Sequence, residues 1–228
     1  MQPQRQTRIR RFISNSFSGI LAGMFIGLGG LAFILAKSTT TSPLLAAALF
    51  PIGLFLVCSF NTNLFTGKIG FALTQDKDAT TYISPLDYLV MLISNFVGAA
   101  IIGLISYFLF RDSIQVIQAA ESVASSRLTP PAAPIDIFAP FLKAVVCGAL
   151  VYAAIYLYRR ADSLVSRFIA IFIPIFLFVY LGFNHCVADF FYLSFACSFT
   201  PYSFLHLALV IIGNSFGAIL LNAFVTRK

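Results

Sequence analysis

The chain has 228 residues, of which 59% are hydrophobic and 10% are charged, and its mean hydropathy is +0.91. A water-soluble domain carries about 25% charged residues, so this composition excludes a soluble globular fold, and no polar stretch is long enough to build a separate soluble core. The net charge of +7 lies mainly at the chain ends and in short loops. That distribution indicates membrane topology and excludes a nucleic-acid-binding face.

Six charge-poor segments are expected to cross the bilayer. A spanning helix needs about 20 apolar residues. Because lipid offers no hydrogen bonds, only helices or closed barrels can span, and these runs are too long for barrel strands. The first run lacks a clear signal-peptide cleavage site, so we expect it to be retained. We predict an all-α integral membrane protein with one channel domain, 1–228, in halves 12–110 and 137–226, with spans at 12–36, 43–75, 85–110, 137–158, 164–199 and 203–225.

The basic residues predict the orientation of these spans. Both termini are expected in the cytoplasm, which makes the chain a multi-pass protein of the plasma (inner) membrane. The loop 111–136 then lies outside and is expected to be irregular apart from a short helix at 113–126. The predicted inside residues are Arg5, Arg8, Arg10, Arg11, Lys68, Lys77, Arg159, Arg160, Arg167, Arg227 and Lys228, and the predicted outside residues are Lys37, Arg111, Arg127 and Lys143.

Two spans, 43–75 and 164–199, are too long for one crossing and too short for two. Each has a polar interruption near its middle, at 61–63 and at 182–189. Unpaired backbone at membrane depth is tolerated only where protein or a water-filled cavity surrounds it. We therefore expect the second and fifth helices to be broken, with their polar elbows facing the interior of the bundle.

A short repeat supports this interpretation. The pattern N-x-x-G-A occurs at Asn95 in the third span and again at Asn214 in the sixth. Three spans per half with matching breaks predict an inverted 3+3 repeat, and transporters place their binding sites near the midplane of such repeats.

Polar residues at membrane depth are candidate functional groups. His185 lies in the second elbow, and we expect it to line a pathway and to exchange hydrogen bonds or a proton with what passes. Asn184 and Thr66 could supply neutral hydrogen bonds. Asp189 could cap a half-helix, pair with His185 or face the lumen. Lys143 could snorkel toward water or attract anions at a pore mouth.

The remaining candidates favour packing. His206 lies in a continuous helix and is expected to pack. No cysteine pair has C-x-x-C spacing, so we expect buried small side chains, no metal site and no cofactor. An enzyme using Cys186, His185 and Asp189 is disfavoured, because neighbouring residues in an elbow usually point apart, whereas nucleophile and base must meet. The cysteines are Cys58, Cys147, Cys186 and Cys197.

The two elbows resemble those of the formate/nitrite transporter family. Residues 64–67 read L-F-T-G, where the family has L-F-T-G/S, and residues 182–189 read G-F-N-H-C-V-A-D, where it has G-F-E-H-S-I-A-N. The similarity continues through 95–98, 141–144 and 213–217, and covers about 12–226. Asn184, Asp189 and Tyr152 depart from the usual Glu, Asn and Asn.

This resemblance implies an aquaporin-like protomer of six helices in a homopentamer. The implied substrates are small monovalent anions of weak acids, with formate first and nitrite, hydrosulfide, acetate or lactate as alternatives. His185 matches a central histidine, Thr66 the threonine that faces it, and Lys143 a vestibule lysine. The resemblance also implies an outer constriction of Phe50, Ile155 and Phe178 and an inner one of Leu54, Leu64 and Phe65.

Dry constrictions imply a proton-coupled mechanism. An ionised carboxylate in a dry medium costs tens of kcal/mol by Born estimate, so the anion must acquire or share a proton to cross. We expect flux to rise at low outside pH. The rival in another class is an aquaporin-like pore for neutral solutes, although this chain lacks N-P-A motifs at its breaks. A purely structural membrane protein leaves the paired elbows unexplained.

Overall fold

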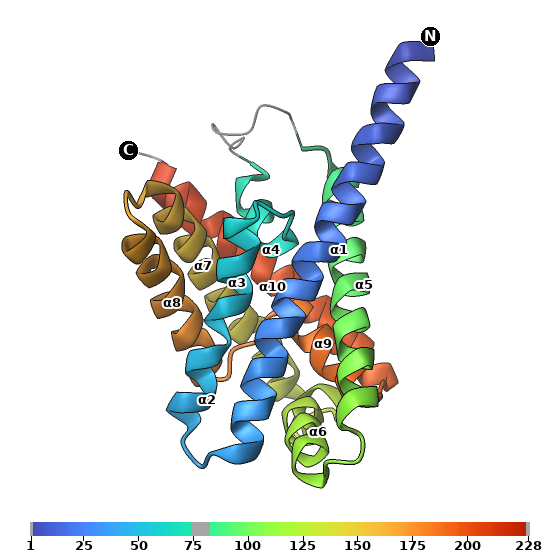
Figure 1. The fold of residues 1–228 in the computed structure, drawn as a ribbon, viewed down its shortest axis with the longest axis vertical. Coiled ribbons are helices and arrows are strands. Elements are labelled where there is room, and N and C mark those ends of the chain that lie inside the picture. Colours follow the sequence, from blue (N-terminus) through green and yellow to red (C-terminus); the bar gives the residue numbers. More distant parts are fainter. Residues whose placement is uncertain (1, 74–82, 227–228) are drawn as a thin grey trace.

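The computed structural model describes residues 2–73 and 83–226. For residues 2–11 and 134, which lie within these ranges, it describes the backbone alone. Within these ranges the chain is helical, without a β-strand (Figure 1). Part of the orientation prediction falls on residues outside this description. Those residues are Lys77, Arg227 and Lys228, together with the side chains of Arg5, Arg8, Arg10 and Arg11.

Four helical segments of the described chain are long and apolar enough to cross a membrane. They are Phe12–Thr39 within α1 (Gln2–Thr39), α5 (Pro85–Phe110), Ile135–Arg160, which ends in α7 (Ala139–Arg160), and α10 (Pro201–Thr226). Large apolar side chains are exposed on the same helices, as at Leu89, Ile93 and Phe108 of α5. A helix that is apolar all round suits lipid, and the protein is an integral membrane protein.

The segment expected as the second span is interrupted. It forms α2 (Pro43–Leu49) and α3 (Pro51–Ser59), separated only by Phe50, and then leaves the helical conformation. A short helix, α4 (Phe65–Lys68), and a 3₁₀ turn, η1 (Ile69–Phe71), follow. The break lies at the predicted polar elbow.

The segment expected as the fifth span is interrupted in the same manner, between α8 (Leu164–Tyr180) and α9 (Cys186–Phe195). Both breaks start with a left-handed residue, Asn61 (φ 49°) or Gly182 (φ 68°). After each, an amide bonds back across five residues, from Thr62 to Val57 (3.0 Å) and from Phe183 to Phe178 (2.9 Å). This Schellman geometry closes helix ends and favours Gly or Asn at the left-handed position.

Two helix pairs, α1 with α5 and α7 with α10, cross so closely that only glycine fits. A Cβ added at Gly98 of α5 would lie 1.9 Å from the Ile20 oxygen of α1. A Cβ at Gly217 of α10 would lie 1.9 Å from the Val145 oxygen of α7. Small residues allow such backbone contact in membranes, so the glycines of the N-x-x-G-A patterns have equivalent packing roles.

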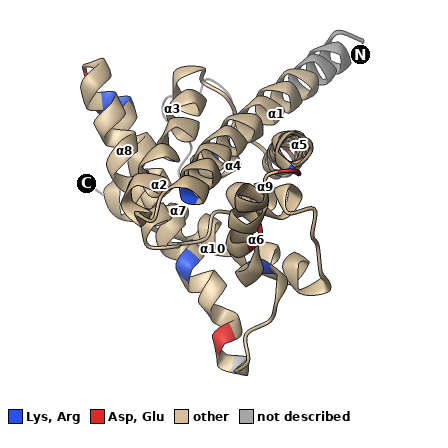
Figure 2. Cartoon of the chain, turned by 60° about the horizontal axis from the view of Figure 1, so that its bottom comes forward, with Lys and Arg blue, Asp and Glu red and all other residues tan. Residues whose placement is uncertain are grey.

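The segment between the halves contains the helix expected at 113–126 and, in addition, a short turn that was not expected. It forms α6 (Ile114–Leu128) and a 3₁₀ turn, η2 (Pro134–Phe138). Helix α6 lies at the end of the molecule opposite both termini (Figure 1), where it packs against α1 and α9. Charged residues are few and lie at scattered positions along the chain (Figure 2). One of them, Arg127 of α6, is buried.

Candidate functional site

The two breaks meet at a pair of buried polar side chains. His185 Nε2 lies 2.8 Å from Thr66 Oγ1, and the residues are 2% and 0% exposed. Thr66 belongs to α4, directly after the first break, and His185 is the N-cap of α9, directly after the second. The sequence analysis expected these two residues to face one another, and the structure brings them together.

The hydrogen bond at the second ring nitrogen of His185 determines which nitrogen carries the hydrogen in the neutral ring. Its Nδ1 accepts the backbone N–H of Ala188 at 3.3 Å, which caps α9. A nitrogen that accepts carries no proton, so the neutral ring carries its hydrogen on Nε2 and donates it to Thr66. Protonating Nδ1 as well would break the Ala188 bond. Capping was one of three roles left open for Asp189, and His185 itself supplies this cap.

Two asparagines hold the broken backbone in place. Asn95 of α5 accepts the Phe65 N–H (2.8 Å) and donates to the oxygens of Asn63 and Gly19 (2.8 Å each). Its side chain thereby satisfies the first elbow, where buried backbone groups would otherwise lack partners. The sequence analysis flagged Asn95 as part of a repeat but missed this role.

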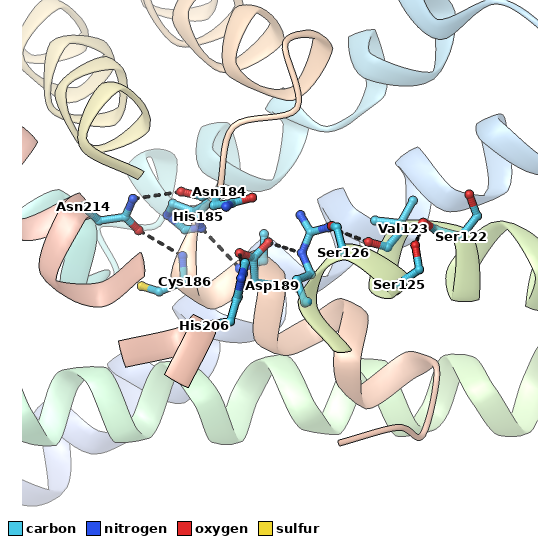
Figure 3. A network of polar contacts seen from close by, with 12 residues as sticks. Ser122, Val123, Ser125, Ser126, Asn184, His185, Cys186, Asp189, His206 and Asn214 are labelled. Carbon is cyan, nitrogen blue, oxygen red and sulfur yellow. Dashed lines mark hydrogen bonds and ion pairs between the residues drawn. The ribbon is translucent and has the colours of Figure 1, made fainter. Parts of the chain in front are cut away.

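Asn214 of α10 does the same for the second elbow (Figure 3). It accepts the Cys186 N–H and donates to the oxygens of Asn184 and Ala144, each at 2.9 Å. Thus Asn184 contributes its backbone oxygen to the support of the elbow. Asn95 and Asn214 therefore make the same set of bonds, one accepted from a backbone N–H and two donated to backbone oxygens. The sequence contained a signal for this role, because each half has one broken helix with unpaired backbone and one asparagine in the repeated pattern.

Apolar side chains enclose the His185–Thr66 pair. The rings of Phe50 and Phe178 meet edge to face at 5.6 Å, and Phe178 stacks on His185 at 6.0 Å. On the Thr66 side, Ile155 approaches Gly67 so closely that a Cβ there would lie 2.5 Å from Ile155 Cδ1. Leu54, Leu64 and Phe65 are also buried.

One of these placements differs from the expectation. Ile155 was grouped with Phe50 and Phe178, but it borders a cavity together with Leu64 and Gly67. The reason is its position in the second half of α7, close to α4 rather than to α2. The apolar residues therefore divide into Phe50 and Phe178 on one side of the polar pair, and Leu64 and Ile155 on the other.

Cavities lie on both sides of this region. The proximal cavity, of about 90 Å³, faces the termini and is bordered by Asn61, Leu64, Lys68, Ile155 and Arg159. The distal cavity, of about 220 Å³, faces α6 and is bordered by Arg127, Phe178, His185 and Asp189. Next to it lies a vestibule of about 280 Å³, bordered by Lys143, Asn184 and His206. His185 and Thr66 thus lie between two spaces on opposite sides, each large enough to hold several water molecules.

The distal cavity contains a buried charge network that the sequence did not predict (Figure 3). Asp189 accepts from Arg127 Nε at 2.7 Å and pairs with His206 Nε2 at 3.0 Å. Arg127 was expected to mark the outer loop, and His206 to pack. The sequence did contain a signal for this network. An acidic residue at membrane depth usually pairs with a cationic group, and the sequence has few basic residues that could lie near Asp189.

Tyr152, the third departure from the family pattern, is part of the packing. Its hydroxyl donates to Asn222 Oδ1 at 2.7 Å, and Asn222 donates to the Gly70 oxygen at 2.6 Å. This chain of bonds ties α7 and α10 to η1. Within the described residues, no group of three or more His, Cys, Asp or Glu side chains could hold a metal ion.

Comparison with known proteins identifies a family that matches this chain. The chain matches the family model described as formate/nitrite transporter over residues 4–227. It is similar to the uncharacterized transporter YrhG of Bacillus subtilis (strain 168), with 30% identity over 217 residues, covering 87% of this chain and 78% of that protein. Nitrite transporter NirC of Salmonella typhimurium is 30% identical over 198 residues, covering 80% and 70%.

The chain is also similar to proteins that are named for formate. The probable formate transporter of Methanothermobacter thermautotrophicus is 28% identical over 203 residues, covering 76% of this chain and 71% of that one. A solved structure described as a pentameric formate channel with formate bound shares the fold, with a TM-score of 0.73, 21% identity and coverage of 95% and 94%.

Proposed function

The chain belongs to the formate/nitrite transporter family, and from this premise we propose that it conducts small monovalent anions of weak acids across a membrane, with formate as the first choice. Two relatives are named for formate and nitrite. Nitrite, hydrosulfide and acetate or lactate are the alternatives within the same class.

The proposal includes the architecture. Six crossings arise if the two broken segments each count as one, and the halves 12–110 and 137–226 of the single domain 1–228 then form an inverted repeat with an aquaporin-like protomer. The support is the equivalence of Asn95 and Asn214, and of the Gly98 and Gly217 crossings. A homopentamer is proposed by analogy with the pentameric formate channel that shares the fold.

Conduction runs along the line from the vestibule through His185 to the proximal cavity. Lys143 attracts anions to the vestibule. Phe50 and Phe178, then Leu64 and Ile155, are the apolar constrictions, and a bare anion cannot cross them at a Born cost of tens of kcal/mol. The permeating species must therefore be neutral, or share a proton, where it passes them.

His185 and Thr66 provide hydrogen bonds between the constrictions. In the neutral ring, the Nε2–H direction is fixed by the ring, whereas the Thr66 hydroxyl hydrogen can rotate. An oxygen atom of the anion that lies within reach of both groups can accept from both, in exchange for their mutual contact of 2.8 Å. Two donors directed at one oxygen suit a carboxylate or a nitrite. Asn184 and Asp189 lie beside this point, and we assign them to the wall of the pathway rather than to the donor pair.

The observation that carries the proposal is this buried pair, formed by two broken helices between two apolar layers. The test is uptake of formate, nitrite, hydrosulfide and acetate into proteoliposomes, with protein-free liposomes as the control. We expect saturable formate uptake that rises as the outside pH falls. Uptake that is independent of pH contradicts the proton-coupled mechanism, and rapid glycerol swelling without anion uptake indicates a neutral-solute pore instead.

A further inference from the structure

The guanidinium of Arg127, on α6, is held in place by three sets of contacts. Its Nε donates to Asp189 Oδ1 at 2.7 Å, and its Nη1 donates to the Val123 oxygen and to Ser126 Oγ. The group also lies over the ring of Tyr192, with 5.2 Å between its central carbon and the ring centroid. The whole residue is 8% exposed. Because the guanidinium is planar and rigid, these contacts fix the direction of its remaining N–H groups.

The second terminal nitrogen of this guanidinium, Nη2, is still available. Arginine has five N–H donors, and the contacts above use those of Nε and Nη1. Within the described residues, Nη2 has no hydrogen-bond partner, and the one buried side-chain atom without a partner is His206 Nδ1. Nη2 is therefore not buried, and its two hydrogens can be donated to a molecule that reaches it.

Arg127 and His185 border the same space, the distal cavity. Its volume of about 220 Å³ leaves room for a small anion, and Phe178 of the proposed constriction also borders it. Ser122 and Ser126 are exposed residues of its border, so solvent enters from the α6 side. Ser126 borders the vestibule as well. An anion in the vestibule can therefore move into the distal cavity, next to His185.

Asp189 moderates the charge that such an anion meets. It forms an ion pair with Arg127, and its other oxygen lies 3.0 Å from His206 Nε2. The carboxylate is thus held from two helices, α6 and α10, and it offsets the charge of the guanidinium without occupying Nη2. Conduction requires a site that binds strongly enough for entry and weakly enough for release. A paired arginine with donors to spare meets both conditions.

We propose that Arg127 is an anion-binding residue of the distal cavity, which holds the substrate between the vestibule and His185. An oxygen of the anion accepts from Nη2, while Nε stays on Asp189. The ligand class is a small oxygen anion such as formate, acetate or nitrite, because hydrogen bonds from an ionised donor to such an oxygen are short and strong. Sulfur is a weaker acceptor, so hydrosulfide gains less from this site. The inference rests on the proposed function and names a further residue for it.

The test is the concentration dependence of formate uptake by Arg127→Lys. Lysine keeps a positive charge for Asp189, but its single ammonium group cannot serve Asp189 and the cavity together. We expect the KM for formate to rise at least ~10-fold, because one hydrogen bond to a charged group is worth about that factor, while the maximal rate changes little. Asp189→Asn removes the moderating charge, so its KM should fall. As a matched control, Arg111→Lys alters an exposed arginine just before α6 and should keep the wild-type KM.

Each result decides a separate point. A wild type that takes up no anion refutes the proposed function, and this inference falls with it. Wild-type uptake together with an unchanged KM in Arg127→Lys refutes the inference alone. An ion pair with a purely structural role would lower the unfolding temperature of Arg127→Lys and Asp189→Asn without moving their KM values in opposite directions, and that pattern also refutes it.

If Arg127→Lys does not assemble, a structure of the wild-type protein in formate decides. The proposal requires a formate oxygen within hydrogen-bond distance of Arg127 Nη2 in the distal cavity. A distal cavity that holds only water under these conditions overturns it.

Discussion

His185 combines two jobs in one side chain. Its Nδ1 caps α9 through Ala188, and its Nε2 faces Thr66 in the middle of the bundle. The cap contributes about 0.5–2 kcal/mol to the stability of the protein. A hydrogen bond from Nε2 to a permeating anion would contribute about 1.5–3 kcal/mol to its binding. The two contributions can be separated, because an asparagine retains the first and loses the second.

We therefore predict different outcomes for two substitutions at this position. His185→Asn should keep the cap and the thermal stability, while formate uptake falls about 10- to 100-fold because the donor between the constrictions is lost. His185→Phe should lose both, with a stability decrease of about 1 kcal/mol. Uptake into proteoliposomes and thermal unfolding in detergent measure the two effects. Wild-type uptake by His185→Phe would remove the ring from the pathway.

At the scale of elements, the two broken helices are built to one plan. Each first half ends with a left-handed residue, Asn61 or Gly182. Each second half begins beside an asparagine from a neighbouring long helix, Asn95 for α4 and Asn214 for α9. A break at membrane depth is stable only if its backbone groups find partners, and a single amide with three bonds supplies them.

This leads to a prediction about Asn214. Its replacement by leucine removes three hydrogen bonds and leaves the Cys186 N–H without a partner, and a buried group left unsatisfied costs about 1–3 kcal/mol. We expect Asn214→Leu to lower the unfolding temperature of the purified protein clearly. The matched control is Ser215→Ala, because the Ser215 hydroxyl donates to the Ile211 oxygen of its own helix. Equal stability of both variants would contradict the bridging role.

Sequence reasoning succeeded for elements with strong local signals. The span 85–110 and both breaks were predicted from charge-poor runs and from polar interruptions within them. It failed where the signal is long-range. Nothing near Arg127 shows that it reaches Asp189 from 62 positions away, and the placement of Ile155 depends on how α7 packs against α4. The helix expected at 113–126 was found close to its predicted bounds, as α6, whereas the 3₁₀ turn η2 was not predicted.

At the scale of the whole molecule, three spaces lie in sequence along the bundle. The vestibule and the distal cavity face α6, and the proximal cavity faces the termini. Because Lys143 borders the vestibule while Lys68 and Arg159 border the proximal cavity, basic residues lie at both mouths. Under the proposed function, either side can therefore attract anions, and the direction of flow would follow the gradients of anion and proton.

The orientation can be tested with a native cysteine. Cys197 is exposed in the turn between α9 and α10. The same turn contacts the end of α6, where Thr200 Oγ1 donates to the Leu128 oxygen at 2.7 Å. If both termini are cytoplasmic, Cys197 lies outside, and a membrane-impermeant maleimide should label it in right-side-out vesicles. Partial burial raises the pKa of the Cys197 thiol. The reactive thiolate is then scarcer at neutral pH, and labelling should accelerate as the pH is raised.

The other cysteines make this test selective. Cys147 and Cys186 are buried, and Cys58 borders the proximal cavity on the opposite side. A Cys197→Ser variant should therefore abolish labelling in right-side-out vesicles. In inside-out vesicles, Cys58 is the residue within reach. Labelling of Cys197 from the cytoplasmic face alone would mean that the orientation is the reverse of the predicted one, with the vestibule facing the cytoplasm.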